Sequence, residues 1–457
     1  MGALFPDGNG ICRLLDAGAG IGSLSAAFLA RWRSGGFQFQ KVELDVFELD
    51  HELIRHLSST LASYNNSGNL EVNIREADFI HAAVDSLAGS LFSTPLQSYT
   101  HAILNPPYKK INSNSAHRHA LRRVGIETVN LYSAFVALAV ALMAPGGHIV
   151  AIIPRSFCNG PYYRPFREFI LEHCAIRHMH LFASRNKAFK DDEVLQENVI
   201  IHLECGAEQR IVQVSTSTDD TFNDIVIYEH PYESIVFPGD SERFIHIPTS
   251  LEKCGIELSS VIRYTLEDIG LKVSTGPVVD FRLKSHLRDI SDSVTVPLLY
   301  PCHFSGYKTT WPLIDSKKPN AVERNPETEK WLYPNGFYCV VRRFSSKEEK
   351  RRIVASVVDP NTFSDASALG FENHLNLFHE NKQGISKALA WGLAVYLNST
   401  DVDKKFRRFN GHTQVNATDL RTMKYPSREA LIKLGEWAMW QEDISQSAID
   451  EKVGSLT

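Results

Sequence analysis

Residues 1–204 alternate between short runs rich in β-branched and aromatic residues and longer stretches whose apolar residues have helical spacing. Because parallel strands must be joined by crossover connections, usually helices, this alternation leaves few folds open and predicts a doubly wound, mostly parallel α/β sheet. Ligands bind such sheets at the carboxyl ends of the strands. The expected strands are Arg13–Ala17, Val42–Leu49, Leu70–Arg75, Tyr99–Leu104, Gly147–Ile153 and Asn198–Leu203, and the expected helices are Ser23–Arg33, His51–Ser63 and Asn130–Met143.

From about Gly206 the chain has shorter runs, Pro/Gly turns and scattered aromatics, which predicts a mixed α+β domain. Its later stretches, Lys387–Leu397 and Arg428–Trp440, have helical patterns. A chain of 457 residues is about three times the usual domain length of ~150 residues. We therefore expect an α/β domain over residues 1–205, a connecting segment over 206–260 and a C-terminal domain over 261–457.

Composition excludes several classes of protein. Hydrophobic residues make up 43% and charged residues 22% of the chain, so it is not mostly disordered. The longest apolar stretch, Leu131–Ala144, is too short to cross a bilayer. Seven cysteines, none in C-x-x-C spacing, argue against a disulfide framework and a zinc site. We expect a cytoplasmic protein that makes no membrane contact and requires no metal.

A glycine-rich loop, D-A-G-A-G-I-G from Asp16 to Gly22, follows the first expected strand and precedes a helix. Gly18, Gly20 and Gly22 allow a tight turn and a close approach of backbone to ligand, and the helix start offers free N–H groups. Such a loop alone is weak evidence, because a plain strand-to-helix turn has the same composition. It also departs from the G-x-G-x-x-G dinucleotide pattern.

Acidic residues follow the next two expected strands. Glu48, or Asp50 beside it, can accept hydrogen bonds from both hydroxyls of a ribose, although Asp50 also suits a helix start. Asp78 can accept from an adenine amino group, and Phe79 can pack on the ring. Together with the glycine loop, these strand ends predict a site for an adenosine-type ligand.

The fourth expected strand runs into N-P-P-Y, the most specific motif of the chain. Pro106 and Pro107 fix the backbone and remove two donors, so the turn is rigid. The amide oxygen of Asn105 and the carbonyl of Pro106 can accept both N–H bonds of a planar amino group. This would orient the nitrogen lone pair towards a methyl donor and offset its growing positive charge. Tyr108 can stack on the ring that bears the amino group.

These residues resemble the N6-adenine DNA methyltransferases, as do N-L-Y-S-A-F (130–135), L-M-A-P-G-G (142–147) and I-I-P-R-S-F (152–157). The resemblance implies a class I S-adenosylmethionine-dependent methyltransferase fold, with the methyl-donor motif before the catalytic motif and target recognition in the C-terminal domain. A-F-K-D-D-E-V-L-Q-E-N-V-I (188–200) is similar to the segment whose aromatic packs on the flipped adenine. That role would fall to Phe189.

The C-terminal part contains three further segments, residues 274–282, 333–352 and 409–421. They resemble the PstI/BsuBI type of restriction–modification methyltransferases. The resemblance covers nearly the whole chain. It implies methylation of double-stranded DNA at a palindrome, CTGCAG in those relatives, in a bacterial cytoplasm. A restriction endonuclease would be a genetic partner rather than part of a stable complex, and a monomer is expected.

Members of this family have a further segment before the glycine loop that covers the methionine end of the cofactor. Fifteen residues precede Asp16 here, and none of them resembles it. Two alternatives therefore stay open beside the adenine methyltransferase: a DNA-binding relative with impaired catalysis, and a protein glutamine N-methyltransferase, since N-P-P-Y serves that reaction too. The second leaves the long C-terminal part without an obvious use.

Basic clusters predict DNA contacts, because the net charge of −5 requires local clustering for nucleic-acid binding. The segment 109–123 contains no acid and follows the catalytic motif directly, so we expect a flexible polar loop beside an extruded base. A charge run is also often only a solvated face. The candidate DNA-binding residues are Lys109, Lys110, Arg118, Arg122, Arg123, Arg342, Arg343, Lys404, Lys405, Arg407, Arg408, His412 and Gln414.

Overall fold

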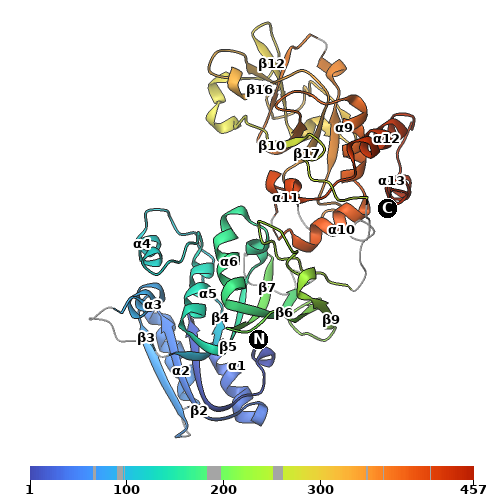
Figure 1. Ribbon diagram of the computed structural model, residues 1–457. Coiled ribbons are helices and arrows are strands. Elements are labelled where there is room, and N and C mark those ends of the chain that lie inside the picture. The colour runs from blue at the N-terminus through green and yellow to red at the C-terminus, as the bar shows by residue number, and fades with distance from the viewer. Residues whose placement is uncertain are drawn as a thin grey trace. The chain divides into compact units, whose positions relative to one another are not determined.

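The computed structural model describes residues 1–64, 68–89, 96, 98–182, 197–250, 261–345, 348–363, 365–411 and 413–456. The chain divides into two compact units, Met1–Leu251 and Glu252–Thr457 (Figure 1). Each unit has its own sheets and its own hydrophobic core, and each is described separately below.

The first unit is built on a nine-stranded mixed sheet with the order β3-β2-β1-β4-β5-β7-β6-β8-β9. The five strands from β3 to β5 are parallel, whereas β7 is antiparallel to both β5 and β6. The order reverses between β1 and β4, the place where ligands bind sheets of this kind. The strands are β1 (Asn9–Ala17), β2 (Gln38–Glu48), β3 (Leu70–Glu76), β4 (Tyr99–Leu104), β5 (Met143–Pro154), β6 (Cys174–Phe182), β7 (Asn198–Cys205), β8 (Ile211–Ser217) and β9 (Val226–Pro231).

Helices cover both faces of this sheet (Figure 1). Side chains alternate between two cores along β1: Leu14 packs with α1 and α2, whereas Leu15 packs with α3 and α5. α5 is apolar on all its faces and almost fully buried, because it packs against α3, α6 and the strands β4 and β5. The helices are α1 (Ser23–Arg31), α2 (His51–Ala62), α3 (Phe79–Leu87), α4 (Ala116–Arg123), α5 (Leu131–Leu142) and α6 (Arg164–His173).

Each expected strand of residues 1–204 coincides with an observed one, but β6 was not expected. Its alternation is obscured by Arg177, His178 and His180, of which the two histidines are buried. Residues 206–250, expected to connect two domains, instead contribute β8 and β9 to the same sheet. None of the helices in the described ranges is long and apolar enough to cross a membrane.

The second unit contains two small sheets, β10-β20-β17-β18 and β11-β15-β12-β19-β16, together with the hairpin β13–β14. Helices follow the last strand. The strands are β10 (Lys272–Thr275), β11 (Leu287–Arg288), β12 (Thr295–Leu299), β13 (Phe304–Ser305), β14 (Lys308–Thr309), β15 (Ala321–Glu323), β16 (Leu332–Pro334), β17 (Tyr338–Arg342), β18 (Ala355–Val358), β19 (Ala368–Phe371) and β20 (Leu375–His379). The helices are α9 (Lys387–Leu397), α10 (Thr400–Phe409), α11 (Ala417–Thr422), α12 (Arg428–Met439) and α13 (Gln446–Gly454).

Two glycines let α9 and α12 touch backbone to backbone. A Cβ at Gly392 would lie 1.8 Å from the carbonyl oxygen of Leu431, and a Cβ at Gly435 would lie 1.7 Å from that of Ala388. Real side chains cannot occupy such space, so the helix crossing depends on both residues being glycine.

Candidate active site

The glycine loop lies at the carboxyl end of β1 and enters α1. Gly18, Gly20 and Gly22 have φ values of +74°, +57° and +85°, the left-handed region that glycine adopts without strain. The backbone N–H groups of Gly18 and Ala19 donate to the carbonyl oxygen of Phe47 at 2.9 and 3.0 Å. The loop is therefore fixed against the end of β2.

Asp16 lies beneath this loop and is 1% exposed. The hydroxyl of Ser25 on α1 donates to its Oδ2 at 2.6 Å, whereas its buried Oδ1 has no hydrogen-bond partner among the described residues. Burial raises the pKa of the Asp16 carboxyl to about 7, and the hydrogen bonds from Ser25 lower it. A buried acceptor with an unused oxygen suits a ligand that brings a donor to the loop.

Glu48 ends β2, and its carboxylate is held by backbone N–H groups. Its Oε2 accepts from Gly20 at 2.8 Å, and its Oε1 accepts from Leu49 at 2.7 Å and from Asp50 at 3.0 Å. Asp50 itself caps α2 by accepting from the N–H of Glu52 at 2.9 Å. Glu48 is thus oriented beside the glycine loop, while the Asp50 carboxylate is used by its own helix.

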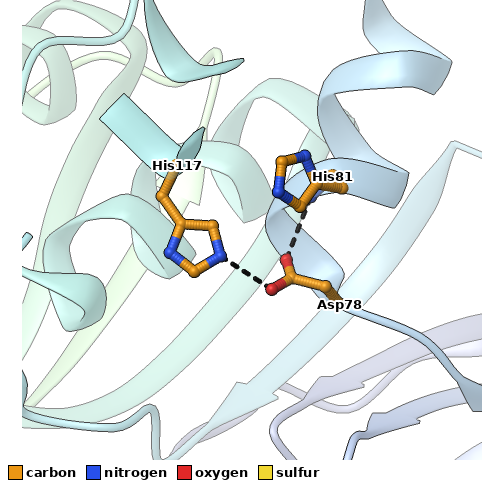
Figure 2. A group of neighbouring side chains, drawn as sticks. All are labelled: Asp78, His81 and His117. Atoms are coloured by element: carbon orange, nitrogen blue, oxygen red, sulfur yellow. Dashed lines mark hydrogen bonds and ion pairs between the residues drawn. The ribbon is translucent and has the colours of Figure 1, made fainter. Parts of the chain in front are cut away.

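Asp78 follows β3 and caps α3. Its Oδ1 accepts from the N–H of His81 at 3.1 Å, and its Oδ2 lies 2.7 Å from Nε2 of His117 on α4 (Figure 2). Phe79 is buried, and its ring packs against Phe47 and Phe135 at centroid distances of 5.2 and 5.1 Å. The expected packing of Phe79 on a ligand ring stays a prediction, because protein rings already surround it.

The N-P-P-Y turn follows β4, the neighbour of β1. Asn105 and Pro107 are exposed, whereas Pro106 is buried, so the turn is anchored by one proline and open at the amide. The Tyr108 hydroxyl donates to Oδ1 of Asn105 at 3.2 Å and lies 3.3 Å from the carbonyl oxygen of Ile152. The amide is consequently oriented by the last residue of the motif.

The glycine loop and the N-P-P-Y turn lie side by side. A Cβ at Gly18 would be 3.4 Å from Cε1 of Phe135 and 3.8 Å from Cδ of Pro107. Any longer side chain at position 18 would fill the space between the two motifs. The proposed methyl-donor loop and the proposed amino clamp therefore share a boundary, as transfer between their ligands requires.

A layer of polar and aromatic residues lies behind the turn. Tyr132 on α5 meets Tyr108 edge to face at 6.2 Å and stacks on Tyr163 at 5.7 Å. The Asn130 amide nitrogen donates to the Tyr163 hydroxyl, while its buried Oδ1 has no hydrogen-bond partner in the described part of the chain. We did not single out these residues from the sequence, although Asn130 and Tyr132 lie in the quoted N-L-Y-S-A-F segment.

Two predicted site residues lie outside the described residues. They are Phe189, expected to pack on a flipped base, and His412, expected to contact DNA.

The second half of the basic segment, residues 116–123, is the helix α4 rather than part of the flexible loop expected from its polar sequence, whereas residues 109–115 are not helical. Ser115 caps α4, and Arg118 is 12% exposed and paired with Glu127. Arg122 also pairs with Glu127, at 3.3 Å, and Arg123 pairs with Asp85 at 3.0 Å. Glu127 and Asp85 lie outside residues 109–123, so the absence of acids within this segment did not indicate that its arginines are free. Lys109 and Lys110 are exposed.

In the second unit, some of the predicted DNA-binding residues form ion pairs within the protein. Arg342 pairs with Glu349, and Arg407 pairs with Asp403 at 2.7 Å. Lys404, Lys405 and Arg408 lie on α10, where Lys404 is exposed. A surface of cationic, polar and aromatic side chains, here called the Arg343 surface, surrounds Arg343. The Arg343 guanidinium donates to Oε1 of Gln414 at 3.2 Å and to the carbonyl oxygen of Asn373 at 3.2 Å. Phe344, 40% exposed, packs there against His374 at 4.8 Å.

Comparisons with known proteins identify the family of the chain. Residues 39–189 match the family "Eco57I restriction-modification methylase". The chain is 58% identical over 447 residues to the type II methyltransferase M.BsuBI of Bacillus subtilis, covering 97% of this chain and 88% of that protein. It is 43% identical over 460 residues to M.PstI of Providencia stuartii, covering 99% and 89%. The fold is similar to that of MmeI, a type IIL restriction-modification enzyme solved with DNA, with a TM-score of 0.53, 10% identity and coverage of 97% and 70%.

Proposed function

This chain belongs to the type II DNA methyltransferases of restriction–modification systems, and from that premise we propose that it methylates N6 of adenine, using S-adenosylmethionine, in a short palindromic DNA site. The observation that carries the proposal is the close approach of Gly18 to Pro107, which brings a cofactor loop and an amino-group clamp to one boundary. The proposed palindrome is CTGCAG, the sequence that the family resemblance implies.

The residues at the carboxyl ends of β1, β2 and β3 fit this cofactor. Gly20 has open space around its missing Cβ, and Asp16 has an unused buried oxygen. Glu48, held beside the glycine loop by the Gly20 N–H, would accept from ribose hydroxyls. Asp78 would accept from the adenine amino group after releasing His117. When bound, S-adenosylmethionine supplies an electrophilic methyl group.

Asn105 and Pro106 would orient the target amino group. Their two carbonyl-type oxygens accept its two N–H bonds, which leaves the nitrogen lone pair facing the glycine loop. The Tyr108 ring stacks on the extruded adenine, and Phe189 is proposed to cover the other face. Base extrusion is needed because a stacked adenine cannot present N6 in line with the methyl group. The reaction requires no covalent link between enzyme and base.

The DNA would be double-stranded, with recognition by the second unit and protection from a partner restriction endonuclease as the biological outcome. The surface of Arg343, Phe344, His374 and Gln414 supports this role, because it combines a cation, an exposed ring and two amide or imidazole groups. Arg and Gln side chains can both read base edges in the major groove. A monomer that modifies each strand in turn is sufficient for a palindrome.

Incubation of the full chain with S-adenosylmethionine and plasmid DNA, followed by nucleoside analysis, tests the proposal directly. N6-methyladenine should appear, and cutting at CTGCAG should be lost. Methylation without that protection would keep the reaction and discard the site. Methylated cytosine, or transfer only to protein glutamine, would contradict the proposed reaction.

A further inference from the structure

Asp78, His81 and His117 form a cluster of three metal-type ligands between α3 and α4 (Figure 2). We propose that this cluster binds a first-row divalent transition metal, with Zn²⁺ as the representative ion, and that metal and cofactor exclude one another because both use Asp78. The metal binding follows from the cluster alone, whereas the competition rests on the proposed function.

The distances suit a shared ion. One ligand atom from each residue lies within 4.8 Å of the other two, and Asp78 Oδ2 already lies 2.7 Å from His117 Nε2. Tetrahedral ligands with bonds of about 2.0–2.1 Å are separated by roughly 3.4 Å. The two imidazole rings have their centroids 5.3 Å apart, so small side-chain rotations complete the site.

The helices that carry the ligands are held together independently of the cluster. Asp78 is fixed as the cap of α3, and His81 lies about one turn further along the same helix. α4 packs on α3 through buried apolar residues, and Arg123 pairs with Asp85 at 3.0 Å. The ligands are therefore brought together by packed elements, which reduces the ordering cost of binding an ion.

The donor set selects the class of ion. Two imidazoles and one carboxylate suit Zn²⁺, Ni²⁺ or Co²⁺, whereas Mg²⁺ and Ca²⁺ prefer oxygen ligands throughout. Three protein ligands leave a fourth position for water. Neither ring nitrogen of His81 has a hydrogen-bond partner among the described residues, so coordination there would break no existing hydrogen bond.

Calorimetric titration of the chelator-treated full chain with Zn²⁺ tests the site. One equivalent should bind, and His81→Gln and His117→Gln should each weaken binding by about tenfold or more, since even the loss of an outer hydrogen-bond partner costs a metal site 10–100-fold. His119→Gln is the matched control, because His119 is exposed on the same helix but outside the cluster. Absence of binding, or unchanged binding in the double variant His81→Gln/His117→Gln, would overturn the proposal.

Repeating the titration with saturating S-adenosylhomocysteine tests the competition. The apparent Kd for Zn²⁺ should rise, and Zn²⁺ should inhibit wild-type methylation more strongly than methylation by the double variant. An unchanged Kd in the presence of bound S-adenosylhomocysteine would refute the competition while leaving the metal site in place. Formation of N6-methyladenine in metal-free buffer reports separately on the proposed function.

Discussion

The N-P-P-Y turn of the first unit and the Arg343 surface of the second unit are assembled in opposite ways. Asn105 to Tyr108 are consecutive, and the Tyr108 hydroxyl donates to the Asn105 amide within the same four-residue turn. Arg343, Asn373 and Gln414 come from three segments that are far apart in the sequence and meet only in the folded unit. The difference teaches that the proposed chemistry is local in sequence, whereas the proposed recognition depends on tertiary structure.

Asn105→Ala should produce the largest effect. Removing one acceptor from the amino clamp should lower the methylation rate by about 10²–10³-fold, the usual cost of losing one preorganised hydrogen-bond partner in a transition state. Affinity for DNA should change little. Single-turnover methylation and a gel-shift titration measure the two quantities. Asn112→Ala, a nearby exposed asparagine, should behave as wild type.

Retained turnover in Asn105→Ala would contradict the local origin of the chemistry. It would mean that the amino group is oriented by residues from distant parts of the sequence. The Arg343 surface is assembled from distant segments in the same way.

Acid should weaken the first unit through the buried histidines of its sheet. Burial lowers the pKa of both His101 and His202 to about 3 from 6.5, so both are neutral in the folded chain. Their contribution is complete above pH 6.5 and is lost as the pH falls towards 3, because only the unfolded chain then takes up their protons. Each should lower the free energy of unfolding by about 1.4 kcal/mol per pH unit in this window.

Urea unfolding between pH 7.5 and pH 5 measures this dependence. His101→Gln should reduce the slope, whereas His173→Gln, at an exposed position, should leave it unchanged. An identical slope in wild type and His101→Gln would show that other groups dominate the acid sensitivity.

Gly392→Ala should destabilise the second unit by about 1–3 kcal/mol, the usual cost of overpacking, because its Cβ would overlap the Leu431 carbonyl. Thermal unfolding followed by circular dichroism is the measurement. Gly454→Ala is the control, since open space surrounds a Cβ there. If recognition belongs to the second unit and cofactor binding to the first, Gly392→Ala should lose sequence selectivity at a lower temperature than it loses cofactor binding. Equal loss of both would indicate that the two units unfold together.

Arg343→Ala should reduce discrimination between CTGCAG and a singly substituted site by about 1–3 kcal/mol if Arg343 reads a base. Methylation rates on a set of substituted duplexes measure the change. Arg324→Ala, which removes an ion pair with Glu329 in the same unit, should leave discrimination intact. A uniform loss on all duplexes would instead assign Arg343 to a phosphate contact.

The sequence was sufficient for the strands that precede the glycine loop, Glu48, Asp78 and Asn105, because each is rich in apolar residues or, in β3, alternates them with polar ones, and the motifs follow directly. It was insufficient for β6, whose buried histidines break the apolar pattern, and for β8 and β9, which extend the sheet beyond its expected end.

At the site, sequence reasoning could propose roles but not partners. The pairing of Arg118 with Glu127 and of Asp78 with His117 joins residues nine and thirty-nine positions apart. From the sequence alone the α4 segment is predicted to be a free basic loop, because the acids that pair with it lie outside the segment. The Arg343 surface could not be predicted, because no local sequence pattern indicates that its three distant segments meet.

The hydrogen bond from Tyr108 to Asn105 has a consequence for the rotational state of the Asn105 amide, the proposed amino-group acceptor. A half-turn about its last bond exchanges the oxygen for an NH₂ group, which would repel an incoming amino group. A hydroxyl donor on the oxygen selects one of these two rotamers before DNA arrives. A phenylalanine at position 108 would still stack, but it would leave the choice to be made after the base has entered.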